Sequence, residues 1–181
     1  ISKITKETLY NCYNTFYHPS NTCLVVVGDF QAEEIFEQIK ERLLPRENQG
    51  EIKRIKQEEP EAVVQKETIQ KMEVSIPLFV LGYKDKPQEE EMVKKHIAIE
   101  ILLGMIIGKS SKLYQRLYEE DLLKQEPDLD YEFSKEYAHV MITGKSNNPK
   151  KVQEAIEKQI EEFLQNGLDE NDFQRIKKKI Y

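Results

Sequence analysis

Three histidines have the widest chemical repertoire in this chain, because imidazole can bind a metal or act as a base near neutral pH. They are His18, His96 and His139. His96 and Glu100 are one helical turn apart and could share a metal ion. A zinc site needs three or four protein ligands, and no other His or Cys in the sequence is placed to complete this one. We therefore expect His96 to be structural, and we expect the same of His18, in a His-Pro turn, and of His139, in a predicted strand.

Carboxylate clusters are the next candidates for chemistry, as paired general acids and bases. They lie at residues 58–59, 89–91 and 119–121. Negative side chains are favoured at helix N-termini, so solvated helix ends explain these clusters better than a catalytic pair does. The lysine run at 177–179 is interpreted in the same way, as the positive complement of a helix C-terminus. The sequence also contains no glycine-rich phosphate loop, nucleophile elbow or Cys-x-x-Cys pair.

Composition limits the possible partners. The chain has 181 residues, of which 39% are hydrophobic and 33% charged, and this predicts one compact domain over residues 1–181. Its net charge of -6 gives no basic surface for nucleic acid. The longest apolar run, residues 97–107, is shorter than the roughly 20 residues that a bilayer crossing requires, so we expect no membrane partner.

Cysteine usage indicates a reducing compartment. The two cysteines, Cys12 and Cys23, form no paired framework, so we expect reduced, mostly buried thiols and a cytoplasmic protein. The chain starts at Ile1 without a leader sequence and stops at Tyr181 inside a predicted helix. We therefore expect it to be a fragment excised from a longer protein.

The elements that must position these side chains begin with a predicted helix over residues 5–17, for which Thr5 is a plausible N-cap. Residues 22–27 form a continuous β-branched and leucine run, which predicts an inner strand buried on both faces. Asp29 can cap a following helix that ends before Pro45. Residues 46–66 then turn polar and charged, and we expect a loop or linker there.

Beyond the linker, residues 72–80 alternate with period 2, which predicts a strand in which Met72, Val74, Ile76, Leu78 and Val80 share a face and Pro77 marks an edge or bulge. Residues 89–107 predict a long helix at the centre of the core. A shorter helix over 113–118, a hairpin of strands at 129–133 and 138–142, and helices at 148–166 and 169–180 follow. This order, without regular βαβ alternation, predicts an α+β fold: a two-layer structure of antiparallel sheet with helices packed on one face.

Residues 16–30 read Phe-Tyr-His-Pro-Ser-Asn, an apolar run and then Val-Gly-Asp-Phe, leading into an acidic helix. This phrase resembles the pitrilysin/insulinase-type zinc peptidases, the M16 family, where it joins the zinc-bearing half to the half that follows. The resemblance covers almost the whole chain and implies the same two-layer fold. Family members hold zinc on a His-x-x-Glu-His helix, which this chain lacks, so zinc is implied for the full-length protein and no cofactor is expected in this fragment.

A second resemblance lies at residues 110–117, Ser-Ser-Lys-Leu-Tyr-Gln-Arg-Leu. In active family pairs a similar helix is followed by an Arg and, seven residues later, a Tyr that contact substrate. When the motif is aligned with this sequence, Tyr118 stands at the position of the arginine and Gln125 at the position of the tyrosine. Neither supplies the fixed positive charge of arginine, so the resemblance leaves them as weak substrate-contact candidates and leaves no catalytic residue in the chain.

The resemblance therefore implies a non-catalytic C-terminal domain of a bacterial M16-like subunit. Its expected partners are the upstream zinc-binding domain of the same chain, a second M16-like subunit in a heterodimer, and an unfolded peptide enclosed between the two. One alternative is a catalytically dead M16-like scaffold or assembly subunit, and another is an unrelated acidic α+β interaction domain. An upstream His-x-x-Glu-His would separate the peptidase from the scaffold.

Overall fold

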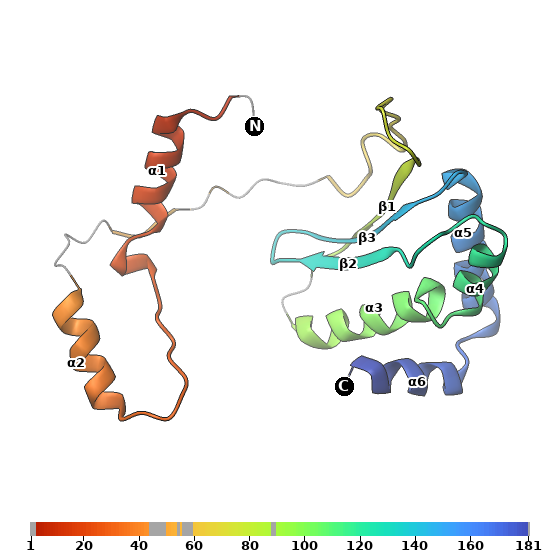
Figure 1. Ribbon diagram of the computed structural model, residues 1–181. Helices are drawn as coiled ribbons and strands as arrows, with labels where there is room; N and C mark the ends of the chain where they lie inside the picture. Colours follow the sequence, from red (N-terminus) through yellow and green to blue (C-terminus); the bar gives the residue numbers. More distant parts are fainter. Residues whose placement is uncertain (1–2, 44–49, 54, 56–59, 88–89, 181) are drawn as a thin grey trace. The chain divides into compact units, whose positions relative to one another are not determined.

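The computed structural model describes residues 3–43, 50–53, 55, 60–87 and 90–180. The chain divides into two compact units, an N-terminal unit of Ile1–Lys56 and a C-terminal unit of Gln57–Tyr181. This division falls inside the predicted linker at 46–66, much of which lies outside the described residues, as does the helix stop expected at Pro45. Figure 1 shows the elements of both units, and one domain over residues 1–181 stays a prediction.

The N-terminal unit contains helix α1 (Lys6–Phe16), a short 3-10 helix η1 (Pro19–Asn21) and helix α2 (Ala32–Arg42). The predicted cap of α1 is confirmed, because the side-chain oxygen of Thr5 accepts a hydrogen bond from the Thr8 amide at 3.3 Å. The predicted cap of α2 is wrong. Gln31 occupies the N-cap position in place of Asp29, and no side chain caps that end.

Residues 22–27 do not form the predicted inner strand within this structure. They form neither helix nor strand and pair with no strand among the described residues, and Val25 and Val27 are 77% and 91% exposed. Cys12 and Cys23 are free, but both are exposed where buried thiols were expected. The residue types favour a strand locally, but a strand buried on both faces also needs neighbouring strands.

The described residues of the C-terminal unit form three strands and four helices. In chain order they are β1 (Leu78–Asp85), α3 (Met92–Ile107), α4 (Lys112–Glu119), β2 (Asp128–Phe133), β3 (Ala138–Lys145), α5 (Pro149–Asn166) and α6 (Glu170–Ile180). The predicted glycine at the end of α5 is confirmed, since Gly167 has a φ of 78°. Asp169 Oδ1 accepts a hydrogen bond from the Asp172 amide at 2.9 Å, which confirms the predicted opening of α6.

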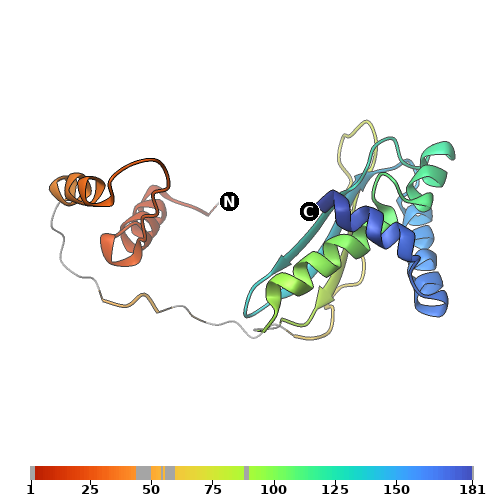
Figure 2. The ribbon, with the colours of Figure 1, turned by 90° about the horizontal axis from the view of Figure 1, so that it is seen from below.

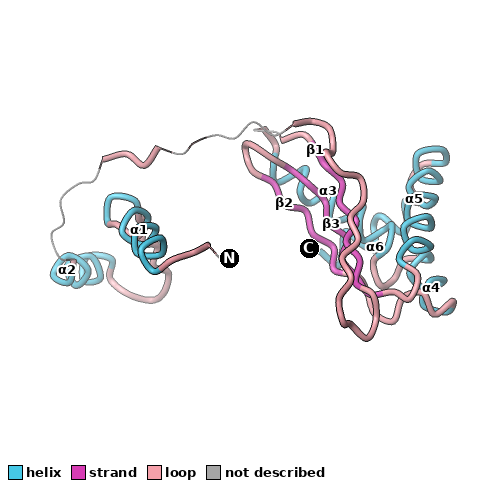
Figure 3. Tube along the Cα trace, turned by 90° about the horizontal axis from the view of Figure 1, so that it is seen from above, coloured by secondary structure: helices cyan, strands magenta, loops and turns pink. Residues whose placement is uncertain are grey.

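The sheet has the order β1-β3-β2 and is antiparallel throughout. The central strand β3 pairs with β1 from Leu78↔Lys145 to Asp85↔Ala138, and with β2 from Asp128↔Thr143 to Phe133↔Ala138. Figures 1 and 3 show the helices of this unit on one side of the three strands. The predicted α+β fold, an antiparallel sheet with helices on one face, is therefore confirmed.

The predicted first strand of this unit is wrong in its start, and the apolar row that the prediction rested on is not the buried one. The strand begins at Leu78, directly after Pro77, and its inward side chains are Phe79, Leu81 and Tyr83. Leu78 and Val80, which belong to the predicted apolar row, are 59% and 60% exposed. Successive side chains of a strand point to opposite faces, and here both rows of side chains are apolar. If the wrong row is taken as buried, every side chain of the strand is assigned to the wrong face.

The core lies between the sheet and the helices. As predicted, α3 is at its centre, with Leu103, Ile106 and Ile107 buried. Figure 2 shows α6 against α3, where Gly104 permits close approach: a Cβ at this position would lie 3.1 Å from Ile176 Cγ2. The remaining buried residues of the main cluster come from five further segments: Phe79, Leu113, Tyr114, Leu117, Leu123, Ile142, Val152 and Ile156.

Candidate functional site

Helix α4 presents the first of the two substrate-contact candidates. Ser111 caps the helix, because its side-chain oxygen accepts a hydrogen bond from the Tyr114 amide at 3.0 Å. Leu113, Tyr114 and Leu117 anchor one face of α4 in the core. Tyr118 lies at the end of the helix and is 56% exposed, with its ring 6.1 Å from the ring of Tyr114. Its hydroxyl is therefore accessible to a molecule that binds at this end of α4.

Gln125, the second candidate, lies in the turn between α4 and β2 and is exposed. Its neighbour Glu126 is better fixed, because Glu126 Oε1 accepts a hydrogen bond from the Lys109 amide at 2.7 Å. Burial raises the pKa of Tyr114, and the negative charge of Glu126 and the nearby Tyr118 raise it further. Both candidates are thus solvent-facing side chains, and Tyr118 lies close to a phenol that stays neutral at physiological pH.

One polar group of the C-terminal unit joins three elements, and the sequence did not predict it. Lys95 Nζ lies 2.6 Å from Asp85 Oδ2, and the Tyr131 hydroxyl donates a hydrogen bond to the same oxygen at 2.8 Å. Asp85 comes from β1, Lys95 from α3 and Tyr131 from β2. Tyr131 is 46 positions from Asp85, and neither has a local spacing pattern that could have revealed the pair.

The contacts within this group shift the pKa values of Asp85 and Tyr131. Burial acts to raise the pKa of Asp85, but hydrogen bonds from Lys95, Tyr131 and the Lys86 amide, with the positive charge of Lys95, lower it overall. Burial and the hydrogen bond to Asp85 raise the pKa of Tyr131 to about 12. The group is therefore a charged carboxylate held by an ammonium and a neutral phenol, an arrangement suited to fastening α3 to the sheet.

The three histidines lie in different surroundings. His18 Nδ1 accepts a hydrogen bond from the Ser20 amide at 3.3 Å and lies 2.7 Å from Ser20 Oγ, which confirms its local role. His96 Nε2 lies 3.4 Å from Glu100 Oε1, and its ring packs against the rings of Tyr131 and Phe133. Its Nδ1 atom is buried and makes no hydrogen bond to any described residue.

His139 Nε2 lies 3.6 Å from Glu132 Oε2, across the β2–β3 pair, and the His139 ring stacks on Tyr137. Each of His96 and His139 thus has one carboxylate neighbour. In the described part of the chain, no three His, Cys, Asp or Glu side chains are grouped so that they could hold a metal ion. The described residues therefore do not fit the zinc that the resemblance implies.

A cavity of about 410 Å³ opens beside α3, close to Glu126. Its wall combines apolar side chains with charges of both signs. The lining residues are Glu100, Leu103, Gly104, Gly108, Lys109, Ser110, Glu126, Leu129, Tyr131, Ile176, Lys179 and Ile180. Among these lining residues, the hydroxyl of Ser110 accepts a hydrogen bond from Arg175.

Comparison with known proteins places this fold and site in a family. Residues 3–180 match the family model described as the Peptidase M16 inactive domain. The chain is 37% identical over 161 residues to the uncharacterized zinc protease YmfH of Bacillus subtilis (strain 168), covering 86% of this chain and 38% of that protein.

Two solved structures resemble the chain. One is a candidate M16-like peptidase from Alicyclobacillus acidocaldarius, with a TM-score of 0.83, 31% identity, and coverage of 99% of this chain and 43% of that one. The other is a protease from Helicobacter pylori, with a TM-score of 0.78 and coverage of 97% of this chain and 43% of that one. At 19% identity, this second likeness shows the fold alone.

The chain therefore belongs to the M16 peptidase family and corresponds to its inactive domain. It spans less than half the length of the relatives that it matches. Within the described residues, no helix combines the length and hydropathy that a membrane crossing requires.

Proposed function

We propose that this chain is the non-catalytic domain of a pitrilysin-like zinc peptidase, in which it forms part of the wall around an enclosed peptide and part of the surface on which a partner subunit docks. The observation that carries the proposal is the match of residues 3–180 to the inactive domain of the family. The zinc belongs to the full-length protein. Its ligands would lie in an upstream domain of the same chain, because the described residues here do not supply them.

The bare face of the sheet supports a role as a wall. Helices cover one face, while Leu78 and Val80 are exposed on the other. On this open face the side chains of Asp128, Asp130 and Glu132 alternate with the inward residues of β2. A surface that mixes apolar and acidic side chains can contact an extended peptide without selecting a single sequence.

Photo-crosslinking in the full-length protein tests the wall. The probe p-benzoylphenylalanine would replace Val80 on the open face or, as the control, Lys158, which is exposed on α5. An unfolded peptide substrate should crosslink at position 80 and not at position 158. Equal labelling at both positions, or labelling at position 158 alone, would exclude the open face as the peptide-facing wall.

A heterodimer with a second M16-like subunit completes this proposal, because the chain has neither the arginine nor the tyrosine of the family motif. A sister chain would supply them. Native mass spectrometry of the full-length protein from its source should find two different chains. The idea fails if the full-length subunit cleaves peptides as a monomer or homodimer, and a full-length chain without His-x-x-Glu-His would indicate a scaffold instead.

Tyr118 and Gln125 remain our proposed weak substrate contacts, supported by their exposure near the end of α4. The proposal places the protein in the cytoplasm, on the basis of two free cysteines without a disulfide framework.

A further inference from the structure

The cavity of about 410 Å³ beside α3 lies on the helix-covered side of the sheet, whereas the proposed wall is the open side. Its lining comes from α3, from inward-facing residues of β2, from the end of α6 and from the turns on either side of α4. The proposed function makes no use of this cavity. Its dimensions and its charges indicate what it can bind.

Helix α3 and strand β2 run in opposite directions along the cavity. Toward the start of α3, the His96 ring lies 6.0 Å from the ring of Tyr131. Just beyond the end of α3, the Lys109 amide donates a hydrogen bond to Glu126 Oε1, shortly before β2 begins. The lining therefore extends from Glu100 and Tyr131 at one end to Lys109 and Glu126 at the other.

This extent suits a short peptide. The α3 residues from Glu100 to Gly108 that line the cavity cover about 12 Å of the helix axis, at about 1.5 Å per residue. An extended chain covers about 3.3–3.6 Å per residue, so a peptide of three residues is about 10 Å long. Pockets for small ligands have volumes of about 300–1,000 Å³, and this cavity is within that range.

The middle of the cavity is apolar. Leu103 and Ile176 are 5% and 4% exposed, and Leu129 is partly buried against the core. Gly104 lines the same space without a side chain. Apolar side chains of a ligand that rest on this lining leave water, and their burial supplies binding free energy.

The charged residues of the lining are two glutamates and two lysines, Glu100, Glu126, Lys109 and Lys179. Their formal charges cancel, which suits a ligand that carries one charge of each sign. Glu126 already accepts the Lys109 amide, but the ammonium groups of Lys109 and Lys179 pair with no carboxylate among the described residues. Glu100 is 45% exposed, with Oε1 3.4 Å from His96 Nε2. The cavity can thus receive an ammonium at Glu100 and a carboxylate at Lys109.

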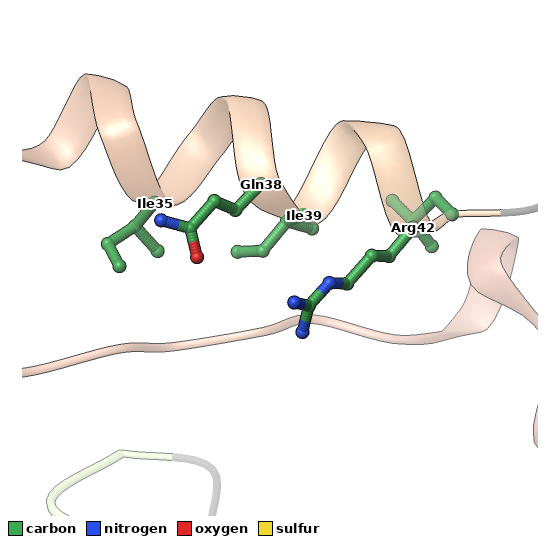
Figure 4. A pocket seen from close by; sticks show the side chains of 5 residues that line it. Ile35, Gln38, Ile39 and Arg42 are labelled. Carbon is green, nitrogen blue, oxygen red and sulfur yellow. The ribbon is translucent and has the colours of Figure 1, made fainter.

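A hollow on α2 is a weaker candidate for such a ligand. Figure 4 shows this hollow, of about 260 Å³, along one face of the helix. It is lined by Ile35, Gln38, Ile39, Arg42 and Leu43. All five come from α2 and its C-cap, and Arg42 supplies the one charge among them. This lining has no carboxylate that could bind an ammonium.

We propose that the cavity beside α3 binds a peptide of two or three apolar residues with both termini free, whose terminal ammonium pairs with Glu100 and whose terminal carboxylate pairs with Lys109. The inference goes beyond the proposed function, because binding in this cavity requires neither zinc nor cleavage. Hydrolysis of longer peptides is the class of reaction that supplies such a ligand.

Isothermal titration calorimetry of the full-length protein with the tripeptide Leu-Ala-Leu tests the proposal. Acetylation of the N-terminus and amidation of the C-terminus should each weaken binding by about tenfold or more, because each removes a hydrogen bond between charged groups. Equal binding of the free and blocked peptides would overturn the proposal. So would the absence of binding by the free peptide at millimolar concentrations.

Two variants test whether the peptide binds in this cavity. Glu100→Gln should weaken binding of Leu-Ala-Leu about tenfold and leave binding of the N-acetyl peptide unchanged, since that peptide has no ammonium to lose. Lys109→Ala should likewise weaken the free peptide and leave the C-terminal amide unchanged. Lys158→Ala, on the exposed face of α5, is the control and should change neither.

A peptide that binds equally well to the wild type and to both cavity variants binds elsewhere, and this result would refute the proposal. The measurement records binding and does not depend on peptidase activity. Binding with the predicted dependence on Glu100 and Lys109, in a full-length protein that contains no zinc and cleaves no peptide, would refute the proposed function and leave this inference standing.

Discussion

Lys95 Nζ lies 2.6 Å from Asp85 Oδ2, so an ion pair joins the first turn of α3 to the end of β1. Tyr131 on β2 donates a hydrogen bond to the same carboxylate oxygen. The three elements that meet there position the outer strands of the sheet against the central helix. Removal of the carboxylate charge should therefore affect stability more than the loss of an exposed ion pair would.

For Asp85→Asn we expect a loss of about 1–3 kcal/mol in the free energy of unfolding at pH 7, because a partly buried ammonium loses its charged acceptor. Urea denaturation followed by circular dichroism measures this. Asp130→Asn is the matched control, since Asp130 is exposed on the outer face of β2. It should change stability by less than about 0.5 kcal/mol.

The same pair of variants gives a pH dependence with a defined sign. The pKa of Asp85 is lowered from 3.8 in the folded state, so its contribution is present above pH 3.8 and is lost as the pH falls through the folded value. The stability difference between wild type and Asp85→Asn should therefore be constant from pH 5 to pH 7 and shrink below pH 3.8. A difference that grows on acidification would contradict this account.

Tyr131 gives the corresponding prediction at alkaline pH. Its pKa is raised from 10.0 to about 12, so folding favours the neutral phenol. This contribution is fully present below pH 10.0 and is lost as the pH rises toward 12. Tyr131→Phe should lower stability by about 1 kcal/mol at pH 7 and flatten its decline above pH 10. Unfolding curves between pH 7 and pH 11 for both proteins measure this, and an unchanged decline in the variant would refute it.

Gly144→Ala should destabilise the sheet by about 2–3 kcal/mol, because overpacking a core forces strain. A Cβ at position 144 would lie 2.7 Å from Cζ of Phe79, the buried residue opposite it on β1. Thermal unfolding measures the loss. Gly82→Ala, on the same pair of strands, is the control. A Cβ at position 82 meets nothing within 4 Å, so this variant should be neutral or slightly stabilising.

The sequence predicted most elements of the C-terminal unit because their signals are local. The helix over 89–107 has a continuous apolar pattern, and Gly167 has a position typical of a helix end. The buried face of β1 was missed because apolar residues occupy both of its faces. What decides between those faces is the packing of Phe79 over Gly144, 65 positions away, which no local pattern records.

The inner strand predicted at residues 22–27 does not form in this structure, and the reason is different. Its residue types favour a strand, but pairing requires neighbouring strands that the described chain does not provide. The group around Asp85 depends likewise on contacts between distant segments, and carboxylates, lysines and tyrosines are too common in the sequence for such a group to be predicted. The weak candidates Tyr118 and Gln125 were located through a family motif rather than through their own spacing.

The kinetic prediction for these two residues follows from their exposure. In the active full-length assembly, Tyr118→Ala and Gln125→Ala should leave kcat within about twofold and raise KM by no more than about tenfold, because a contact that does not change in the transition state affects binding alone. Steady-state cleavage of a fluorogenic peptide measures both constants. Glu119→Ala, the exposed neighbour on α4, is the control. If either substitution lowers kcat by about two orders of magnitude or more, that residue is catalytic.

The most direct test of the central claim is the zinc content of the full-length protein. It is measured by inductively coupled plasma mass spectrometry in the wild type and in a double variant that carries His96→Gln and His139→Gln. Both histidines have carboxylate neighbours, so they are the residues of this chain with the best opportunity to bind a metal. The account predicts one zinc per chain in both proteins. Loss of zinc in the variant would place the metal in this chain, and absence of zinc from the wild type would contradict the zinc peptidase.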